Sequence, residues 1–119
     1  MANPFAAEQL VRSGLADRCL RVMFEPREQV VADAMTAVAA TEAVLDAAAV
    51  RAPRLLHGVN ATAWPLVDAA RARAYATRIG FEDTLTLPDG GVARGNGELV
   101  RAALARLTDP ATVRTPENP

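Results

Sequence analysis

Apolar positions along the chain follow two patterns, which together predict alternating helices and short strands. Apolar residues at helical spacing mark four segments, residues 5–13, 27–50, 63–75 and 98–107. Short, nearly continuous apolar runs, typical of buried parallel strands, mark residues 19–24, 54–57 and 76–81. One helix followed by three successive βα units predicts an α/β fold with a parallel sheet and right-handed crossovers.

Residues that interrupt these patterns divide the chain into three parts. Residues 1–15 form a short helix that we interpret as the remnant of a preceding βα unit, with Gly14 as its C-terminal cap. Residues 16–107 hold the three βα units. Residues 108–119 contain three prolines and no apolar period, which predicts a mobile tail. We expect Thr62 and Asn96 to cap the third and fourth helices at their N-termini.

Composition narrows the class of protein. Of the 119 residues, 50% are hydrophobic but only 4% aromatic, as in helices rich in alanine packed on a sheet. The 13 basic and 14 acidic residues are mixed along the chain, so we expect no nucleic-acid partner. The single cysteine excludes an intramolecular disulfide, and no apolar run reaches membrane-spanning length. These features predict a cytoplasmic protein that has no membrane partner.

Charged residues stand where two of the predicted strands end. Arg78 lies in the third strand, and Glu82 and Asp83 follow directly after it. In parallel α/β folds, ligands bind at the carboxyl edge of the sheet, so these three side chains are candidates for chemistry. The alternative, a structural ion pair beside an acidic turn, is equally compatible with the local sequence. Glu25 ends the first strand, where local pairing with a nearby arginine is the simpler interpretation.

The second strand ends at His57, the only histidine, and a loop of small residues follows it. Such a loop, running into a helix N-terminus, offers backbone N–H groups to an anion. We therefore predict a substrate- or anion-binding role for His57, Gly58, Asn60 and Thr62. An ordinary βα turn with a structural histidine is the competing interpretation.

Four sequence blocks resemble a known family. They are RVMFEP (21–26), RLLHG (54–58) with ATAWPL (61–66), TRIGFEDTLTLPDG (77–90) and GNGELV (95–100). In this order and at this spacing, they resemble the β-keto acid cleavage enzymes, whose founding member is 3-keto-5-aminohexanoate cleavage enzyme. The resemblance covers residues 16–107 and implies the C-terminal part of a (βα)8 TIM barrel. Gly97 stands where many members have alanine, which predicts a weaker start of the last helix.

The resemblance implies a reaction and roles for three residues. Family members bind a divalent metal, usually zinc, which polarises the keto oxygen of the substrate. They convert a β-keto acid and acetyl-CoA into acetoacetate and a new acyl-CoA. By resemblance, Glu82 is a metal ligand, whereas Arg78 and Asp83 contact the substrate or assist the chemistry.

The chain departs from the family in one respect that bears on activity. It has no His-x-His pair, from which the family takes its other metal ligands. A catalytic zinc site generally needs three protein ligands, so we expect an incomplete enzyme, inactive alone and weak in zinc binding. The alternatives are a small non-catalytic α/β module that binds an anion and a subunit that completes a barrel on another chain. Exposed sheet edges predict a homo-oligomer or association with a complementary chain.

Overall fold

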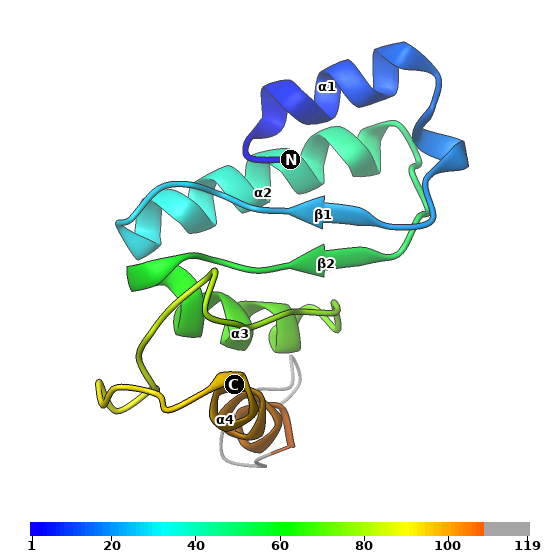
Figure 1. Cartoon of the computed structure of the whole chain (residues 1–119). Coiled ribbons are helices and arrows are strands. Elements are labelled where there is room, and N and C mark those ends of the chain that lie inside the picture. Colours follow the sequence, from blue (N-terminus) through cyan, green and yellow to red (C-terminus); the bar gives the residue numbers. More distant parts are fainter. Residues whose placement is uncertain (109–119) are drawn as a thin grey trace, which may run out of the picture.

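The computed structural model describes residues 1–108, which form an α/β arrangement of short strands and four α-helices (Figure 1). The helices are α1 (Pro4–Ser13), α2 (Val31–Ala47), α3 (Ala63–Ala72) and α4 (Asn96–Thr108); the strands are β1 (Val22–Phe24) and β2 (Arg54–Leu56). Two short 3₁₀ turns, η1 (Ala16–Arg18) and η2 (Asn60–Thr62), precede β1 and α3. Helices α1 and α2 lie on one side of the strands and helices α3 and α4 on the other, with α2 between α1 and β1 (Figure 1).

Strands β1 and β2 pair in parallel, with Val22, Met23 and Phe24 opposite Arg54, Leu55 and Leu56. Helix α2 makes the crossover between them, so this βα unit is confirmed. Phe24 and Leu56 lie opposite each other and are fully buried, because their shared side of the sheet packs against helices. Both arrows in Figure 1 point the same way, so the carboxyl ends of the two strands share one edge.

The third predicted strand, residues 76–81, is reduced to a single parallel bridge between Leu55 and Ala76. The ladder starts normally, since Ala76 N–H donates to Arg54 O (3.1 Å) and Leu56 N–H donates to Ala76 O (2.9 Å). The next acceptor, Leu56 O, instead takes the Thr77 hydroxyl (2.7 Å). A side chain thus occupies the carbonyl that would have continued the ladder, and three complete βα units are not confirmed.

The opposite edge of β1 is also occupied by a single residue. The Met1 amino group donates to Met23 O (2.6 Å), and Glu25 N–H donates to Met1 O (2.7 Å). A parallel neighbour makes this pair of bonds. Backbone pairing therefore runs in chain order from Met1 through β1 and β2 to Ala76.

Helix ends follow the sequence in some places and not in others. Asn3 Oδ1 accepts from Ala6 N–H (2.9 Å) at the start of α1, and Gly14 ends that helix with a φ of 73°, as predicted. Thr62 does not cap α3 through its side chain, because its hydroxyl bonds Val59 N–H and O (both 3.1 Å) inside η2. Thr62 thus stands at the N-cap position of α3, as predicted, but its side chain does not cap the helix. Asn96 is the first residue of α4, and its Oδ1 accepts from Phe81 N–H (2.8 Å).

Two apolar clusters hold these elements together. The larger one joins α1, α2 and α3 to the sheet and contains Phe24, Leu45 and Leu56. The smaller one joins α3 to α4 through Trp64 and Leu99. Of the predicted tail, only Thr108 is described, as the last residue of α4; residues 109–119 lie outside the described part. Within residues 1–108, no helix is long and apolar enough to cross a membrane.

Candidate functional site

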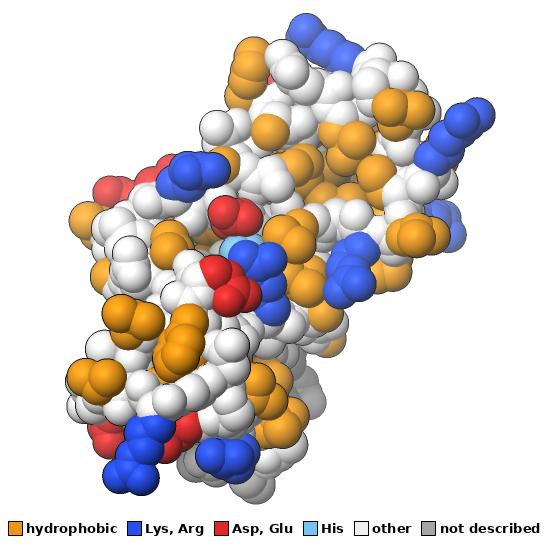
Figure 2. All heavy atoms as spheres, viewed as in Figure 1, with side chains coloured by type: hydrophobic (Ala, Val, Ile, Leu, Met, Phe, Trp, Pro, Cys, Tyr) orange, Lys and Arg blue, Asp and Glu red, His pale blue; other side chains and the backbone are white. Residues whose placement is uncertain are grey.

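Four charged or titratable side chains meet at the carboxyl edge of the sheet. Glu25 follows β1, His57 follows β2, and Arg78 and Asp83 come from the segment after the Ala76 bridge. The main chain fixes the relation between the first two, since His57 N–H donates to Phe24 O (3.1 Å). Figure 2 shows the single histidine recessed in one face of the molecule, with acidic and basic side chains around it. The structure therefore brings His57 together with Arg78 and Asp83, as their places at strand ends suggested.

The His57 ring lies between two carboxylates. Its Nδ1 is 3.4 Å from Asp83 Oδ1 and 3.3 Å from Gly58 O, and its Nε2 is 3.2 Å from Glu25 Oε2. The Nε2 contact has ion-pair distance but lacks the alignment of a hydrogen bond, so this nitrogen has no hydrogen-bond partner among the described residues. His57 is 1% exposed, whereas the Glu25 side chain is 39% exposed. Glu25 thus faces solvent on one side and a buried imidazole on the other.

The two oxygens of Asp83 have different surroundings. Arg78 donates to Oδ1 (3.3 Å), and His57 Nδ1 approaches the same oxygen. Oδ2 is buried in a residue that is only 3% exposed, and within residues 1–108 it has no hydrogen-bond partner. Most buried polar atoms have a partner, so an orphaned carboxylate oxygen marks a position where a ligand atom or water belongs. The Arg78 side chain, by contrast, is 40% exposed.

The backbone around Asp83 is fixed by a tight turn and by the loop after β2. Asp83 and Thr84 N–H groups both donate to Gly80 O, at 2.9 and 3.1 Å. The Asp83 carbonyl accepts from Asn60 N–H at 2.6 Å. Asn60 has a φ of 51°, a left-handed conformation that asparagine tolerates better than most residues. The loop after β2 therefore positions Asp83 through the main chain.

The expected free N–H groups of the loop after β2 are engaged within the chain. Val59 N–H bonds the Thr62 hydroxyl, Asn60 N–H bonds Asp83 O, and Ala61 N–H bonds Gln29 Oε1 (3.2 Å). Thr62 N–H bonds Val59 O (3.1 Å). An anion would have to displace these bonds, so the substrate- or anion-binding role of His57, Gly58, Asn60 and Thr62 stays a prediction without free donors in its support.

Gly58 has a clear steric role in the same loop. A Cβ added to it would lie 2.5 Å from the Thr62 carbonyl oxygen and 2.6 Å from the Thr62 hydroxyl oxygen. These distances are far below van der Waals contact, and one of the atoms belongs to the backbone. Glycine at this position therefore allows η2 to fold back onto the end of β2.

Glu82 is the metal ligand that the resemblance implies. Its side chain is exposed, and its carboxylate lies against Gly80. Within the described residues, no three histidine, cysteine, aspartate or glutamate side chains are grouped so as to hold a metal ion. As the described residues stand, they do not fit a complete zinc site, so we assign no step of the chemistry to a metal.

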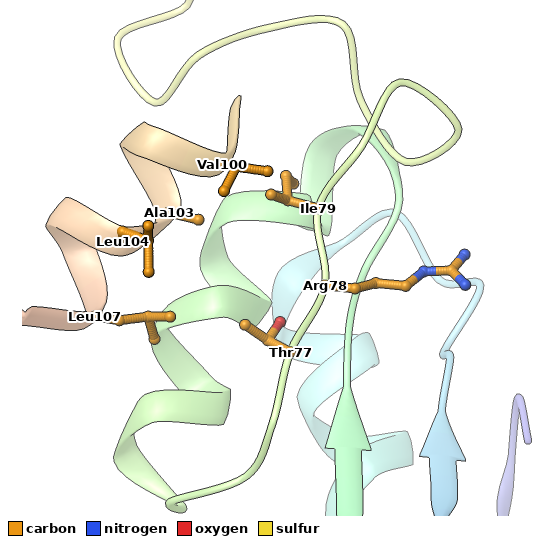
Figure 3. A pocket seen from close by; sticks show the side chains of 7 residues that line it. All are labelled: Thr77, Arg78, Ile79, Val100, Ala103, Leu104 and Leu107. Atoms are coloured by element: carbon orange, nitrogen blue, oxygen red, sulfur yellow. The ribbon is translucent and has the colours of Figure 1, made fainter. Parts of the chain in front are cut away.

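An apolar groove of about 260 Å³ lies beside the cluster, between residues 77–79 and α4 (Figure 3). Thr77, Ile79, Val100, Ala103, Leu104 and Leu107 line it together with the backbone end of Arg78. The Arg78 guanidinium points away from the groove (Figure 3). This segment therefore presents its apolar side chains to α4 and its charged group to Asp83.

The opposite end of the sheet carries a separate polar network. Arg54, at the start of β2, donates to the Tyr75 hydroxyl (3.0 Å) and to Asp46 (2.6 Å), and Tyr75 donates to Glu42 (2.6 Å). Burial, and then the hydrogen bond to Glu42, raises the pKa of Tyr75 above 10.0. Burial lowers the pKa of Arg54, but the bonds to Tyr75 and Asp46 outweigh it and raise the pKa. This network ties α2 to the amino end of β2, whereas the candidate site occupies the carboxyl end.

Comparison with known proteins identifies the family. A family model described as beta-keto acid cleavage enzyme matches residues 5–115, which is most of the chain. The chain belongs to the beta-keto acid cleavage enzyme family. The resemblance seen in the sequence is therefore confirmed. No curated protein and no solved structure matches the chain.

Two residues of this beta-keto acid cleavage enzyme homologue, Glu25 and Gln29, contribute contacts to the site that the sequence does not predict. The local sequence predicts that Glu25 pairs with a nearby arginine, but in the structure it contacts His57, which follows the next strand. Its signal was its place directly after β1, which matches that of His57 after β2. Gln29 gave no signal, yet its side-chain amide binds two backbone groups of the loop after β2, Val59 O (2.9 Å) and Ala61 N–H. Only the crossover geometry brings Gln29 to that loop.

Proposed function

We propose that the chain supplies the Arg78–Asp83 part of a β-keto acid cleavage site, in which a β-keto acid and acetyl-CoA give acetoacetate and an acyl-CoA. The observation that supports this most is the asymmetry of Asp83. Arg78 and His57 hold Oδ1, and Oδ2 is buried without a partner among the described residues. A carboxylate anchored through one oxygen leaves the other free to accept a proton.

The chemistry of the substrate fits this arrangement. The most acidic C–H bond of a β-keto acid lies between its keto group and its carboxylate. We propose that Asp83 Oδ2 accepts that proton as a general base. Arg78, with part of its guanidinium exposed, pairs with the substrate carboxylate as well as with Asp83. Membership of the family supports the substrate class.

Turnover in this proposal needs groups from outside residues 1–108. The described residues hold no group of three metal ligands, and each side of the β1–β2 pair carries only a one-residue bridge or its equivalent. We propose that Glu82 joins metal ligands of a complementary chain or of a further part of the protein. The purified chain alone should then show negligible cleavage of a β-keto acid with acetyl-CoA, and turnover by it would contradict this step.

A chimera tests the role of Asp83 and Arg78. Residues 5–108 replace the corresponding part of an active family member, and acetoacetate formation is measured. We expect Asp83→Asn to lower kcat about 10²–10⁴-fold, as for loss of a general base, and Arg78→Lys to raise KM. The matched control is Asp89→Asn, since Asp89 is exposed in a turn where its Oδ1 accepts from Gly91 N–H. An active chimera whose kcat is unchanged by Asp83→Asn would refute the proposal.

A further inference from the structure

We propose that His57 is a positioning residue, which keeps a proton on Nδ1 to hold Asp83 and shares a second proton with Glu25 at Nε2. This inference rests on the proposed function of Asp83. It assigns to His57 a role different from substrate or anion binding.

The first step concerns Nδ1. Its two polar contacts in the described part of the chain are with Gly58 O at 3.3 Å and Asp83 Oδ1 at 3.4 Å. A carbonyl oxygen accepts only, and the Asp83 Oδ1 already accepts from Arg78. An unprotonated Nδ1 would face two acceptors inside a residue that is 1% exposed, which is strongly unfavourable. Nδ1 therefore carries a hydrogen, directed between Gly58 O and Asp83 Oδ1.

The second step concerns Nε2. Its neighbour, Glu25 Oε2, lies 3.2 Å away and is also an acceptor when ionised. In the proposal, one proton lies between the two atoms and turns a contact between two acceptors into a favourable one. The present alignment is poor, and Nε2 has no hydrogen-bond partner in the described part of the chain. A small rotation of the partly exposed Glu25 side chain would align its Oε2 with Nε2 for a hydrogen bond, because this side chain has more room to move than the buried ring.

The third step concerns charge. Within residues 1–108, the titratable and charged side chains that contact the ring are Glu25 from the end of β1 and Asp83 from the 80–84 turn, and Arg78 contacts Asp83 in turn. Two carboxylates and one guanidinium leave one negative charge, which a proton shared by His57 and Glu25 neutralises. Of these groups, His57 and Asp83 are buried, and a buried charge is stable when it is paired, whereas Glu25 and Arg78 are partly exposed. The proton thus keeps the cluster neutral while Asp83 Oδ2 stays free.

The test reads the ring directly, because His57 is the only histidine in the chain. The whole chain is labelled with ¹⁵N-histidine, and long-range ¹H–¹⁵N correlation spectra are recorded between about pH 6 and 8, on either side of the usual imidazole pKa. We expect Nδ1 to be protonated throughout, in contrast with free imidazole side chains, in which the neutral form with the proton on Nε2 is common. In Glu25→Gln, the new amide donates to Nε2, so we expect a neutral ring with its only proton on Nδ1. A wild-type ring with the proton on Nε2 and a bare Nδ1 would overturn the proposal.

Conservative variants add a functional readout in the chimera described above. An asparagine amide can place an N–H near the position of Nδ1, whereas a glutamine amide places it near Nε2. We expect His57→Asn to keep at least about tenfold more kcat than His57→Gln, since misplacing a catalytic group by about 1 Å costs up to 10²-fold. Equal losses with an unaltered Asp83→Asn effect would overturn the role of His57 and leave that of Asp83 standing. Loss of the Asp83 effect would instead remove the proposed function, whatever the ring spectrum shows.

Discussion

Replacing glycine by alanine is expected to destabilise the fold at Gly58 and to stabilise it at Gly97. Gly58 follows β2 at a point where η2 packs closely on the chain. A Cβ there would lie 2.5–2.7 Å from three atoms of Thr62, two of them backbone atoms. Gly97 lies in the first turn of α4, where a Cβ would meet only the flexible end of Arg101 at 3.5 Å. Replacement by alanine therefore adds the same methyl group to a closed site and to an open one.

The expected magnitudes follow from these distances. Carbon and oxygen atoms in contact lie about 3.5 Å apart or more, so Gly58→Ala needs a backbone shift of about 1 Å. Overpacking of this kind costs about 1–3 kcal/mol. Gly97→Ala should raise the free energy of unfolding by about 0.5–1 kcal/mol, because alanine loses less backbone freedom in a helix than glycine does.

Thermal unfolding followed by circular dichroism measures both effects. With roughly 4 °C per kcal/mol for a domain of this size, Gly58→Ala should lower Tm by about 4–12 °C and Gly97→Ala should raise it by about 2–4 °C. Urea titration provides the independent free energies. If Gly58→Ala proves as stable as the wild type, the close packing of β2 on η2 is not what requires glycine there, and the reasoning fails.

Three further predictions concern the network at the far end of the sheet, the exposed acid and the loop after β2. Burial and the bond to Glu42 raise the pKa of Tyr75, so its neutral form stabilises the fold below the usual tyrosine pKa of 10.0. This contribution to stability is lost as pH rises through the raised pKa. Tyr75→Phe should therefore remove the loss of stability at alkaline pH, measured by urea titrations at several pH values. Glu82→Gln should change the free energy of unfolding by less than about 0.5 kcal/mol because its side chain is exposed, and calorimetry with zinc should show weak binding by the unmodified chain. Gln29→Ala removes two bonds to residues 59–61 and should cost about 1–2 kcal/mol, with faster hydrogen exchange in that loop as the specific readout.

The parts of the fold that depend on apolar spacing could be predicted from the sequence. All four helices and the two strands of the β1–α2–β2 unit lie within the predicted segments or extend them by one or two residues. The turn at residues 88–91 also forms, with Gly90 at a φ of 90° and Asp89 Oδ1 accepting from Gly91 N–H. The predicted helix at 27–50 is shorter, from Val31 to Ala47, because Ala49 takes a φ of 56° at one end and an extended Val30 precedes it at the other.

The end of the strand ladder and the start of α3 could not be predicted, because each depends on which hydrogen-bond partner a threonine side chain has in the folded chain. Nothing in the apolar pattern says that the Thr77 hydroxyl takes Leu56 O and ends the ladder after Ala76. Likewise, Thr62 was expected to cap α3, but its hydroxyl closes η2 instead. A threonine hydroxyl can replace a backbone N–H as the donor to a carbonyl, and whether it does so depends on its position in the folded chain.

In the candidate site, too, some residues are positioned by the predicted strands and others by tertiary hydrogen bonds. The β1–β2 ladder alone places Glu25 and His57 side by side, because both follow the last paired residues, Phe24 and Leu56. Asp83 belongs to no strand. Beyond its own turn, its position depends on contacts with residues that are not its neighbours in the turn, which include Asn60 N–H to its carbonyl and Arg78 to its carboxylate. A change in the loop after β2 can therefore displace Asp83 without touching its side chain. This dependence means that Gly58→Ala should disturb the His57 ring signals as well as stability, since the loop that Gly58 closes is the one that holds Asp83 beside the ring.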